Sequence, residues 1–217
     1  EDNQGTPNLQ ASPTFLNVTT DPQDSDGNLT AAPGVTEPVP LPATADNAGE
    51  AYDVFDFVLS DGGTGDGQSL DVSTIAVRVS GTSTDTERSK VTWRLNGPDA
   101  SNVTGTYNAG SDTITFSPLS LSVADGGSET YTINAYFNDN TGLVEDRTFI
   151  LSVDGDTDLT VDGAGTQIGT TSAVTNGTGT TIDVVATALV FSTQPAGSIS
   201  GSALSTQPVV RAQDAFG

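Results

Sequence analysis

The sequence predicts an all-β protein built as an antiparallel β-sandwich. Thr and Ser are abundant, with 33 and 21 copies among 217 residues, and helix-forming runs are scarce. Apolar residues recur at every second position in about seven separate runs, which is the period of a strand with one buried face. Clusters of Gly, Asp and Asn separate these runs and supply turns. We therefore expect strands and turns, and no helix.

The first segment, residues 1–45, is predicted to be an extended, proline-rich acidic arm or linker. It contains seven of the 11 prolines. Proline lacks the amide donor that a central strand needs, so this stretch favours an arm or a sheet edge. One short strand is possible at residues 14–19, where Phe15, Leu16 and Val18 could make apolar contacts.

Residues 46–187 are predicted to form the sandwich itself. Apolar residues alternate with polar ones at residues 53–59, 74–79, 90–95, 114–116, 131–137, 149–153 and 182–186. Roughly 140 residues are enough to close one sandwich core. Trp93 belongs to the third clear run, so we expect it at the centre of that core.

The last segment, residues 188–217, is predicted to open a further sandwich or to donate a strand to a neighbour. Two strands cannot bury a core alone, so this segment needs a partner. The expected assembly residues are Leu189, Val190 and Phe191 in one strand and Val209 and Val210 in another. Because the chain begins with Glu1 and stops within this unit, we expect a processed or excised piece of a longer protein.

Several stretches resemble a known family. Residues 188–195 (ALVFSTQP) and 207–217 (QPVVRAQDAFG) resemble the opening of an Ig-like repeat of the kind found in tandem in very large bacterial cell-surface and secreted proteins. The preceding unit looks like another such repeat, at residues 45–57, 124–132 (ADGGSETYT) and 181–187 (TIDVVAT). The resemblance covers roughly residues 40–217. It implies an Ig-like sandwich, an extracellular or cell-surface location and neighbouring repeats.

Missing residue types exclude several function classes. The chain has no His and no Cys, which rules out Ser-His-Asp triads, Cys-His dyads, iron–sulfur clusters and disulfides. A net charge of −22 repels phosphate backbones and anionic lipid, so neither nucleic acid nor a membrane is an expected partner. No apolar run is long enough to cross a bilayer. We expect no enzyme activity and no organic cofactor.

Calcium is the one cofactor that the composition allows. Of the 28 acidic residues 22 are Asp, the usual residue of oxygen-ligand loops. Two loops have oxygen-bearing side chains at alternate positions: Asp24, Asp26 and Asn28, and Asp154, Asp156 and Asp158. Neither completes an EF-hand loop, and the second has Leu159 where Gly is required. Solvated acidic turns are the alternative interpretation.

Three further features have a functional and a structural interpretation. Tyr107 is the one aromatic residue expected in a loop, where it could contact a ligand. Lys90, the sole lysine, could form an isopeptide staple only if buried, and the alternation places it outward. Glycosylation sequons occur at Asn17, Asn28, Asn102 and Asn176, about as often as chance predicts in so Thr-rich a chain.

Together these observations predict a non-enzymatic structural subunit of an extracellular bacterial fibre or surface protein. It would assemble head to tail through β-strand contacts, with further copies of itself or with neighbouring repeats of the same chain. One alternative is an adhesin module that binds carbohydrate or a host or matrix protein. A passive stalk spacer is the other.

Overall fold

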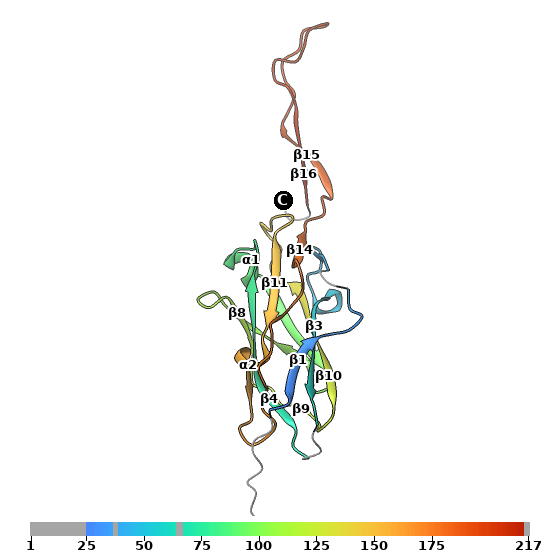
Figure 1. Cartoon of the computed structure of the whole chain (residues 1–217). Coiled ribbons are helices and arrows are strands. Elements are labelled where there is room, and N and C mark those ends of the chain that lie inside the picture. Colours follow the sequence, from blue (N-terminus) through green and yellow to red (C-terminus); the bar gives the residue numbers. More distant parts are fainter. Residues whose placement is uncertain (1–24, 37–38, 64–66, 215–217) are drawn as a thin grey trace, which may run out of the picture.

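The computed structural model describes residues 25–36, 39–63 and 67–214, which form an all-β architecture. Two sheets pack face to face, and a third, two-stranded sheet stands away from them (Figure 1). The expectation of a sandwich is met, whereas the expectation of no helix is wrong. The described residues contain short helical turns at η1 (Ala48–Glu50), α1 (Asp85–Ser89) and α2 (Gly155–Asp158). None of the described helices has the length and apolar character needed to cross a membrane.

The first sheet has five antiparallel strands in the order β1-β3-β10-β5-β6. Their bounds are β1 Gly27–Ala31, β3 Tyr52–Asp61, β10 Ser128–Phe137, β5 Val91–Gly97 and β6 Ala100–Thr104. The two long strands, β3 and β10, pair over most of their length and form its centre. β1 lies at one edge of the sheet.

The second sheet has the order β2-β14-β11-β4-β8-β7, and three short strands join it from the side. The main strands are β2 Leu41–Pro42, β14 Thr180–Asp183, β11 Thr148–Val153, β4 Leu70–Ser80, β8 Thr113–Phe116 and β7 Thr106–Asn108. The short strands β9 (Leu121–Val123) and β12 (Leu159–Val161) pair with β4, and β13 (Val174–Thr175) pairs with β11. β2 and β14 run parallel, and the other named pairs are antiparallel.

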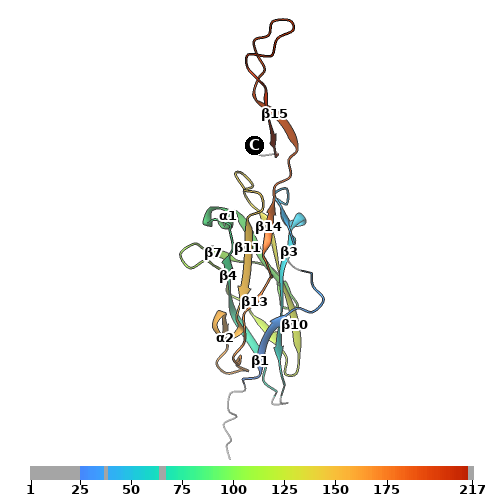
Figure 2. The ribbon, with the colours of Figure 1, turned by 45° about the horizontal axis from the view of Figure 1, so that its top comes forward.

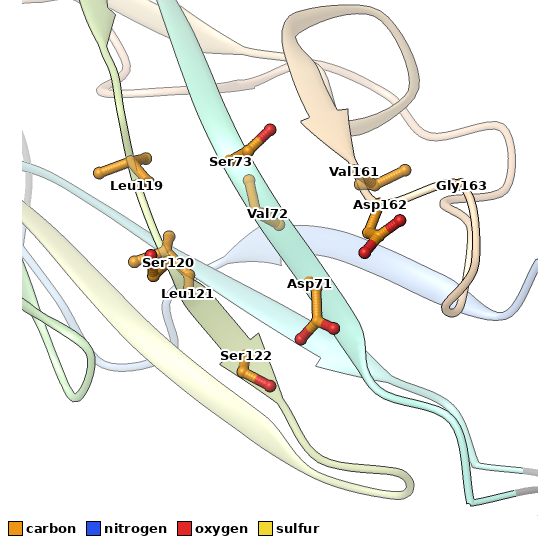
Figure 3. Close-up of a pocket in the computed structure, with 10 residues that line it drawn as sticks. All are labelled: Asp71, Val72, Ser73, Leu119, Ser120, Leu121, Ser122, Val161, Asp162 and Gly163. Atoms are coloured by element: carbon orange, nitrogen blue, oxygen red, sulfur yellow. The ribbon is translucent and has the colours of Figure 1, made fainter.

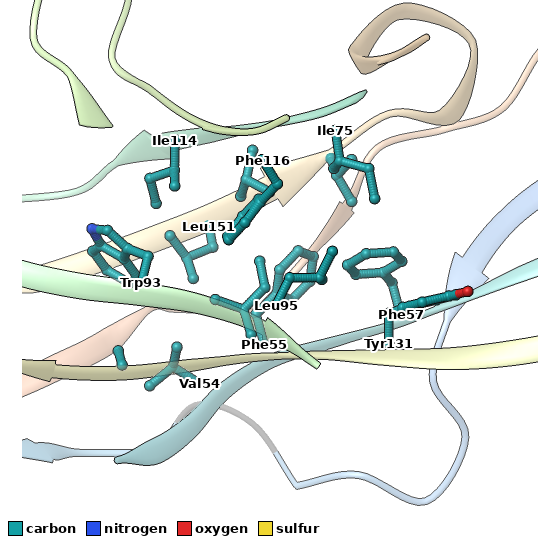
Figure 4. Packing of buried hydrophobic residues seen from close by; sticks show 14 of the residues in the cluster. Val54, Phe55, Phe57, Ile75, Trp93, Leu95, Ile114, Phe116, Tyr131 and Leu151 are labelled. Carbon is teal, nitrogen blue, oxygen red and sulfur yellow. The ribbon is translucent and has the colours of Figure 1, made fainter. Parts of the chain in front are cut away.

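The core lies between the two sheets, where alternate residues point inward. Figure 4 shows side chains of both sheets meeting there: Phe55, Phe57 and Trp93 from the first, and Ile75, Phe116 and Leu151 from the second. Trp93 is 1% exposed, which confirms its predicted place in the core. Its ring meets Phe149 edge to face, with 5.5 Å between the ring centroids. Burying each large apolar side chain stabilises the fold by about 1.5–3 kcal/mol.

One buried polar side chain, Asn176, connects the two sheets. Its amide nitrogen donates to the backbone oxygens of Val54 on β3 and Phe149 on β11, each at 3.2 Å, and lies 3.3 Å from the Thr180 hydroxyl. Its oxygen accepts from the backbone N–H of Leu151 at 2.9 Å. Because Asn176 is fully buried, its sequon is inaccessible in the folded chain.

Part of the segment predicted as an arm belongs to the sandwich. β1 pairs with β3 along its whole length, and its central residue, Leu29, is buried in the core. Leu41 is also buried, on the edge strand β2, where proline at the next position costs no central hydrogen bond. The sandwich therefore extends back to Gly27, past the predicted start at residue 46. The possible strand at residues 14–19 lies outside the described residues.

Candidate docking surfaces

A β-hairpin projects from the end of the sandwich at which α1 lies (Figures 1 and 2). It consists of β15 (Ala188–Thr193) and β16 (Val209–Gln213), which pair with each other alone among the described strands. In the register, Leu189 lies opposite Ala212 and Phe191 opposite Val210. Directly opposed residues share a face, so these four residues form one apolar face.

This apolar face is exposed to solvent. Leu189 is 76% exposed, Phe191 52% and Val210 51%. On the opposite face Val190 lies across from Arg211, so that face is mixed in character. A two-stranded sheet is marginally stable in water, and no other strand of the described chain covers or extends it. The predicted assembly residues therefore lie together on one protruding element.

The hairpin also differs from the sandwich in charge. Residues 184–213 contain no Asp or Glu and carry Arg211, whereas the chain as a whole has a net charge of −22. Two sandwiches brought into contact repel each other, while the hairpin can approach an acidic surface without that cost. This charge asymmetry is a signal for the docking element that strand periodicity alone did not reveal.

A groove of about 530 Å³ runs along the free edge of β1, between that strand and residues 170–175. The N–H of Gly27 donates to the Gln167 oxygen at 3.1 Å, and Gly169 donates to the Gly27 oxygen at 3.1 Å. Beyond Gly27 no backbone hydrogen bond joins the two segments within the described residues, although β13 remains in contact with β1. None of the residues that line it is charged: Asn28, Leu29, Thr30, Ala31 and residues 170–175.

Sequence reasoning missed this groove. Its walls lie far apart in the sequence, and residues 170–175 show no strand alternation. Charge again gives the usable signal, because residues 163–182 contain no charged side chain in a chain with 28 acidic residues. A plot of charge along the sequence would have marked the groove wall and the hairpin among the uncharged stretches, which also include residues 3–20.

A second hollow, of about 520 Å³, lies over β4 between β9 and β12 (Figure 3). Two carboxylates line it, Asp71 and Asp162, together with three Ser hydroxyls. Asp71 accepts a hydrogen bond from the Ser69 hydroxyl at 3.0 Å, and Asp162 accepts one from the backbone of Ala164 at 3.1 Å. Two carboxylates already bonded to the fold identify no ligand, and we assign none.

The first predicted calcium loop is only partly described. Asp24 lies outside the described residues, whereas Asp26 and Asn28 flank Gly27 at the start of β1. Asn28 is exposed and lines the groove. Across the described ranges no group of three or more acidic side chains is placed to hold a metal ion. Calcium binding stays a prediction.

The acidic side chains of the second predicted calcium loop have partners within the fold. Asp158 is buried and forms a bidentate pair with Arg78, at 2.5 and 3.0 Å. Asp154 accepts from the Thr171 hydroxyl at 2.6 Å, and Asp156 lies 3.4 Å from the same hydroxyl. Asp158 therefore pairs with β4, whereas Asp154 and Asp156 share the Thr171 hydroxyl.

Tyr107 and Lys90 both have structural roles. Tyr107 lies on β7, and its hydroxyl donates to Asp85 and Asp112, each at 3.0 Å. Burial, with these two acceptors, raises the pKa of Tyr107 to about 12. Lys90 is largely covered, contacts the backbone oxygen of Thr141 and pairs with Asp139 at 3.3 Å. These partners are surface residues, so Lys90 lies on the outward side as expected, but its ammonium is paired instead of free.

Comparison with known proteins identifies no family for this chain. No family model matches the chain, and no curated protein matches it. One solved structure similar to it is AvmM, described as catalysing macrocyclization in alchivemycin A biosynthesis. The match has a TM-score of 0.34 and 10% sequence identity, and it covers 77% of this chain and 93% of that chain.

This comparison corrects two predictions from the sequence. A non-enzymatic structural subunit of an extracellular fibre, with its adhesin and spacer alternatives, is not retained, because the similar solved structure is an enzyme. The prediction that the chain is not an enzyme is withdrawn for the same reason. A likeness of this degree supports no particular reaction either, so we assign none.

Proposed function

We propose that this chain binds further copies of itself through the β15–β16 hairpin. The observation that carries the proposal is the apolar face formed by Leu189, Phe191, Val210 and Ala212 on a sheet of only two strands. Among the described residues nine large apolar side chains are exposed, and five of them lie in this segment: Leu189, Phe191, Ile199, Val209 and Val210. The proposal concerns binding, and it holds whether or not the chain is also catalytic.

A second copy is the favoured partner because the chain carries both a hairpin without acidic residues and an uncharged groove that could receive it. The hairpin segment contains no acidic residue, and the groove along β1 is lined by uncharged residues. One face of a short hairpin buries less than the roughly 1,200 Å² of total surface that stable interfaces need. We therefore expect weak association. Because the sandwiches repel each other, added salt should strengthen it by screening that repulsion.

We also propose that the sandwich is of the Ig-like type. In an Ig constant-type fold one sheet has the strand order A-B-E-D and the other G-F-C. Assigning the seven letters in chain order to β1, β3, β4, β5, β10, β11 and β14 gives those two orders. Trp93 departs from the pattern, since it lies on the fourth of these strands instead of the third. An extracellular location rests on the resemblance to bacterial surface repeats alone.

Sedimentation velocity over a wide range of concentrations tests the proposed association. The full chain should show mass that increases with concentration and with salt, and Leu189→Ser/Phe191→Ser should stay monomeric. The control is Val35→Ser/Val144→Ser, which removes two exposed apolar side chains outside the hairpin segment. A monomeric wild-type chain at every concentration and salt, or equal association of both double variants, would contradict the proposal.

A further inference from the structure

We infer that the groove along β1 is the site at which β15 of a second copy docks, by adding to the free edge of that strand. The inference rests on the proposed association and names the surface that receives the hairpin. Adding a strand to an exposed sheet edge satisfies backbone groups and buries alternate side chains at the same time.

The backbone of β1 offers the hydrogen-bonding groups that an added strand needs. Both the N–H and the C=O of Gly27 point away from β3, toward residues 167–169. Successive residues alternate in direction, so the N–H and C=O of Leu29 and Ala31 also point away from β3. Within the described chain, the backbone pairing on this side of β1 ends at Gly27. Ala31 is exposed, whereas Leu29 is 2% exposed, so the accessible part of this edge lies at Ala31.

The groove walls suit an extended, uncharged strand. Ala31 and Ala173 are exposed and have small side chains, so they leave the backbone edge accessible. Leu29 and Val174 line its floor and are already 2% and 9% exposed, so an incoming strand would cover mainly the exposed residues of the two walls. A volume of about 530 Å³ falls within the range of ordinary binding pockets, about 300–1,000 Å³.

Charge distinguishes this groove from the other hollow of the sandwich. The hollow between β9 and β12 contains Asp71 and Asp162, whose charges would lose water if an apolar strand covered them. The groove along β1 contains no charged side chain. An apolar hairpin without acidic residues therefore meets no desolvation cost from a carboxylate there.

The placement of the two elements favours a second copy over the same chain. The hairpin projects from one end of the sandwich, and β1 lies toward the opposite end in both views (Figures 1 and 2). The hairpin of one chain consequently points away from its own groove. Contact between unlike surfaces of two copies is heterologous, so each bound copy leaves one hairpin and one groove open.

Two groove variants and one matched control test the inference in the full chain. Ala31→Pro removes an N–H that points into the groove and leaves the hydrogen bonds of β1 to β3 in place. Ala173→Glu puts a charge in the groove, and Ser120→Glu adds the same charge to the other hollow. We expect each groove variant to weaken association by about tenfold or more and Ser120→Glu by less than about twofold, measured by sedimentation. Circular dichroism first checks that each variant is folded.

A mixing experiment separates failure of this inference from failure of the proposed function. Leu189→Ser/Phe191→Ser keeps its groove, and Ala173→Glu keeps its hairpin. Each should be monomeric alone, and the mixture should form a 1:1 dimer and nothing larger. If the groove variants associate like the wild type while the hairpin variant does not, the hairpin docks elsewhere and the inference is overturned. A mixture that stays monomeric overturns it too, whereas a wild-type chain that never associates overturns both proposals.

Discussion

The sandwich and the hairpin are built from the same kind of strand, yet they differ in what covers them. Phe57 on β3 and Phe191 on β15 each have a polar residue on one side and a Val on the other, but Phe57 is fully buried and Phe191 is 52% exposed. β3 has strands on both sides and a second sheet across from it, whereas β15 has one neighbour. A strand-like apolar run thus does not show by itself whether its apolar side chains are buried, because that depends on the strands and sheets around it.

The largest expected difference between the two regions is in stability. Trp93→Ala leaves a cavity in the core and should reduce the free energy of unfolding by about 3–5 kcal/mol. Phe191→Ala removes an exposed ring and should change it by less than about 0.5 kcal/mol. Urea unfolding followed by circular dichroism measures both. A comparable loss for the two variants would mean that the hairpin is part of the cooperative core.

A second test concerns the polar link inside the sandwich. Asn176→Ala leaves the Leu151 N–H and two backbone oxygens without their partner, so we expect a loss of roughly 2–3 kcal/mol. Asn138→Ala is the matched control, because that amide is exposed, makes a 3.3 Å hydrogen bond to the Thr92 hydroxyl and should cost much less to remove. Urea unfolding compares them, and equal effects would contradict a bridging role for Asn176.

Acid should weaken the end of the sandwich at α1. Burial alone would raise the pKa of Glu87, but hydrogen bonds from Thr84 and Arg147 outweigh it and hold that pKa below its ordinary value. The stabilising contribution is therefore present above the unfolded-state pKa and is lost as the pH falls through the folded-state pKa. Glu87→Gln should cost roughly 1.5–3 kcal/mol at neutral pH and less near pH 3, measured by urea unfolding at both. An unchanged cost at the two pH values would contradict this account.

The smallest expected effect is at Tyr107. Tyr107→Phe removes hydrogen bonds to Asp85 and Asp112 and should cost about 1 kcal/mol near neutral pH. Because the folded state raises the pKa of Tyr107 to about 12, the wild-type advantage should be full below pH 10 and fade as the pH rises through 12. Urea unfolding at several alkaline pH values measures it. An advantage that grows with pH would be inconsistent with a neutral, donating hydroxyl.

Much of the fold could be predicted because alternation is a local signal. The runs around Phe57, Val77, Trp93 and Ile133 all became strands with the expected faces buried. β1 was missed because the prolines nearby favour an arm, although Leu29 lies in the core. α1 was missed too, despite the Thr84 and Glu87 capping box that starts it.

The candidate site also has one part that the sequence could predict and one part that it could not. Leu189 and Phe191 could be named from the sequence, because a strand-like run shows its own apolar residues. The groove could not, because Ala31 and Ala173 become neighbours only when β1 and residues 170–175 are placed side by side by the fold. Likewise, only the structure brings Arg78 to Asp158, a residue that the sequence offered as a calcium ligand.

Hydrogen exchange of the full chain, read by mass spectrometry at low and high protein concentration, tests most directly whether the hairpin is an uncovered docking element. At low concentration, amides of β3 and β10 should be strongly protected, and those of β15 and β16 should exchange within seconds. At high concentration β15 and the β1 edge at Leu29 and Ala31 should gain protection together. Hairpin amides as protected as those of β3 in the dilute chain would contradict the account.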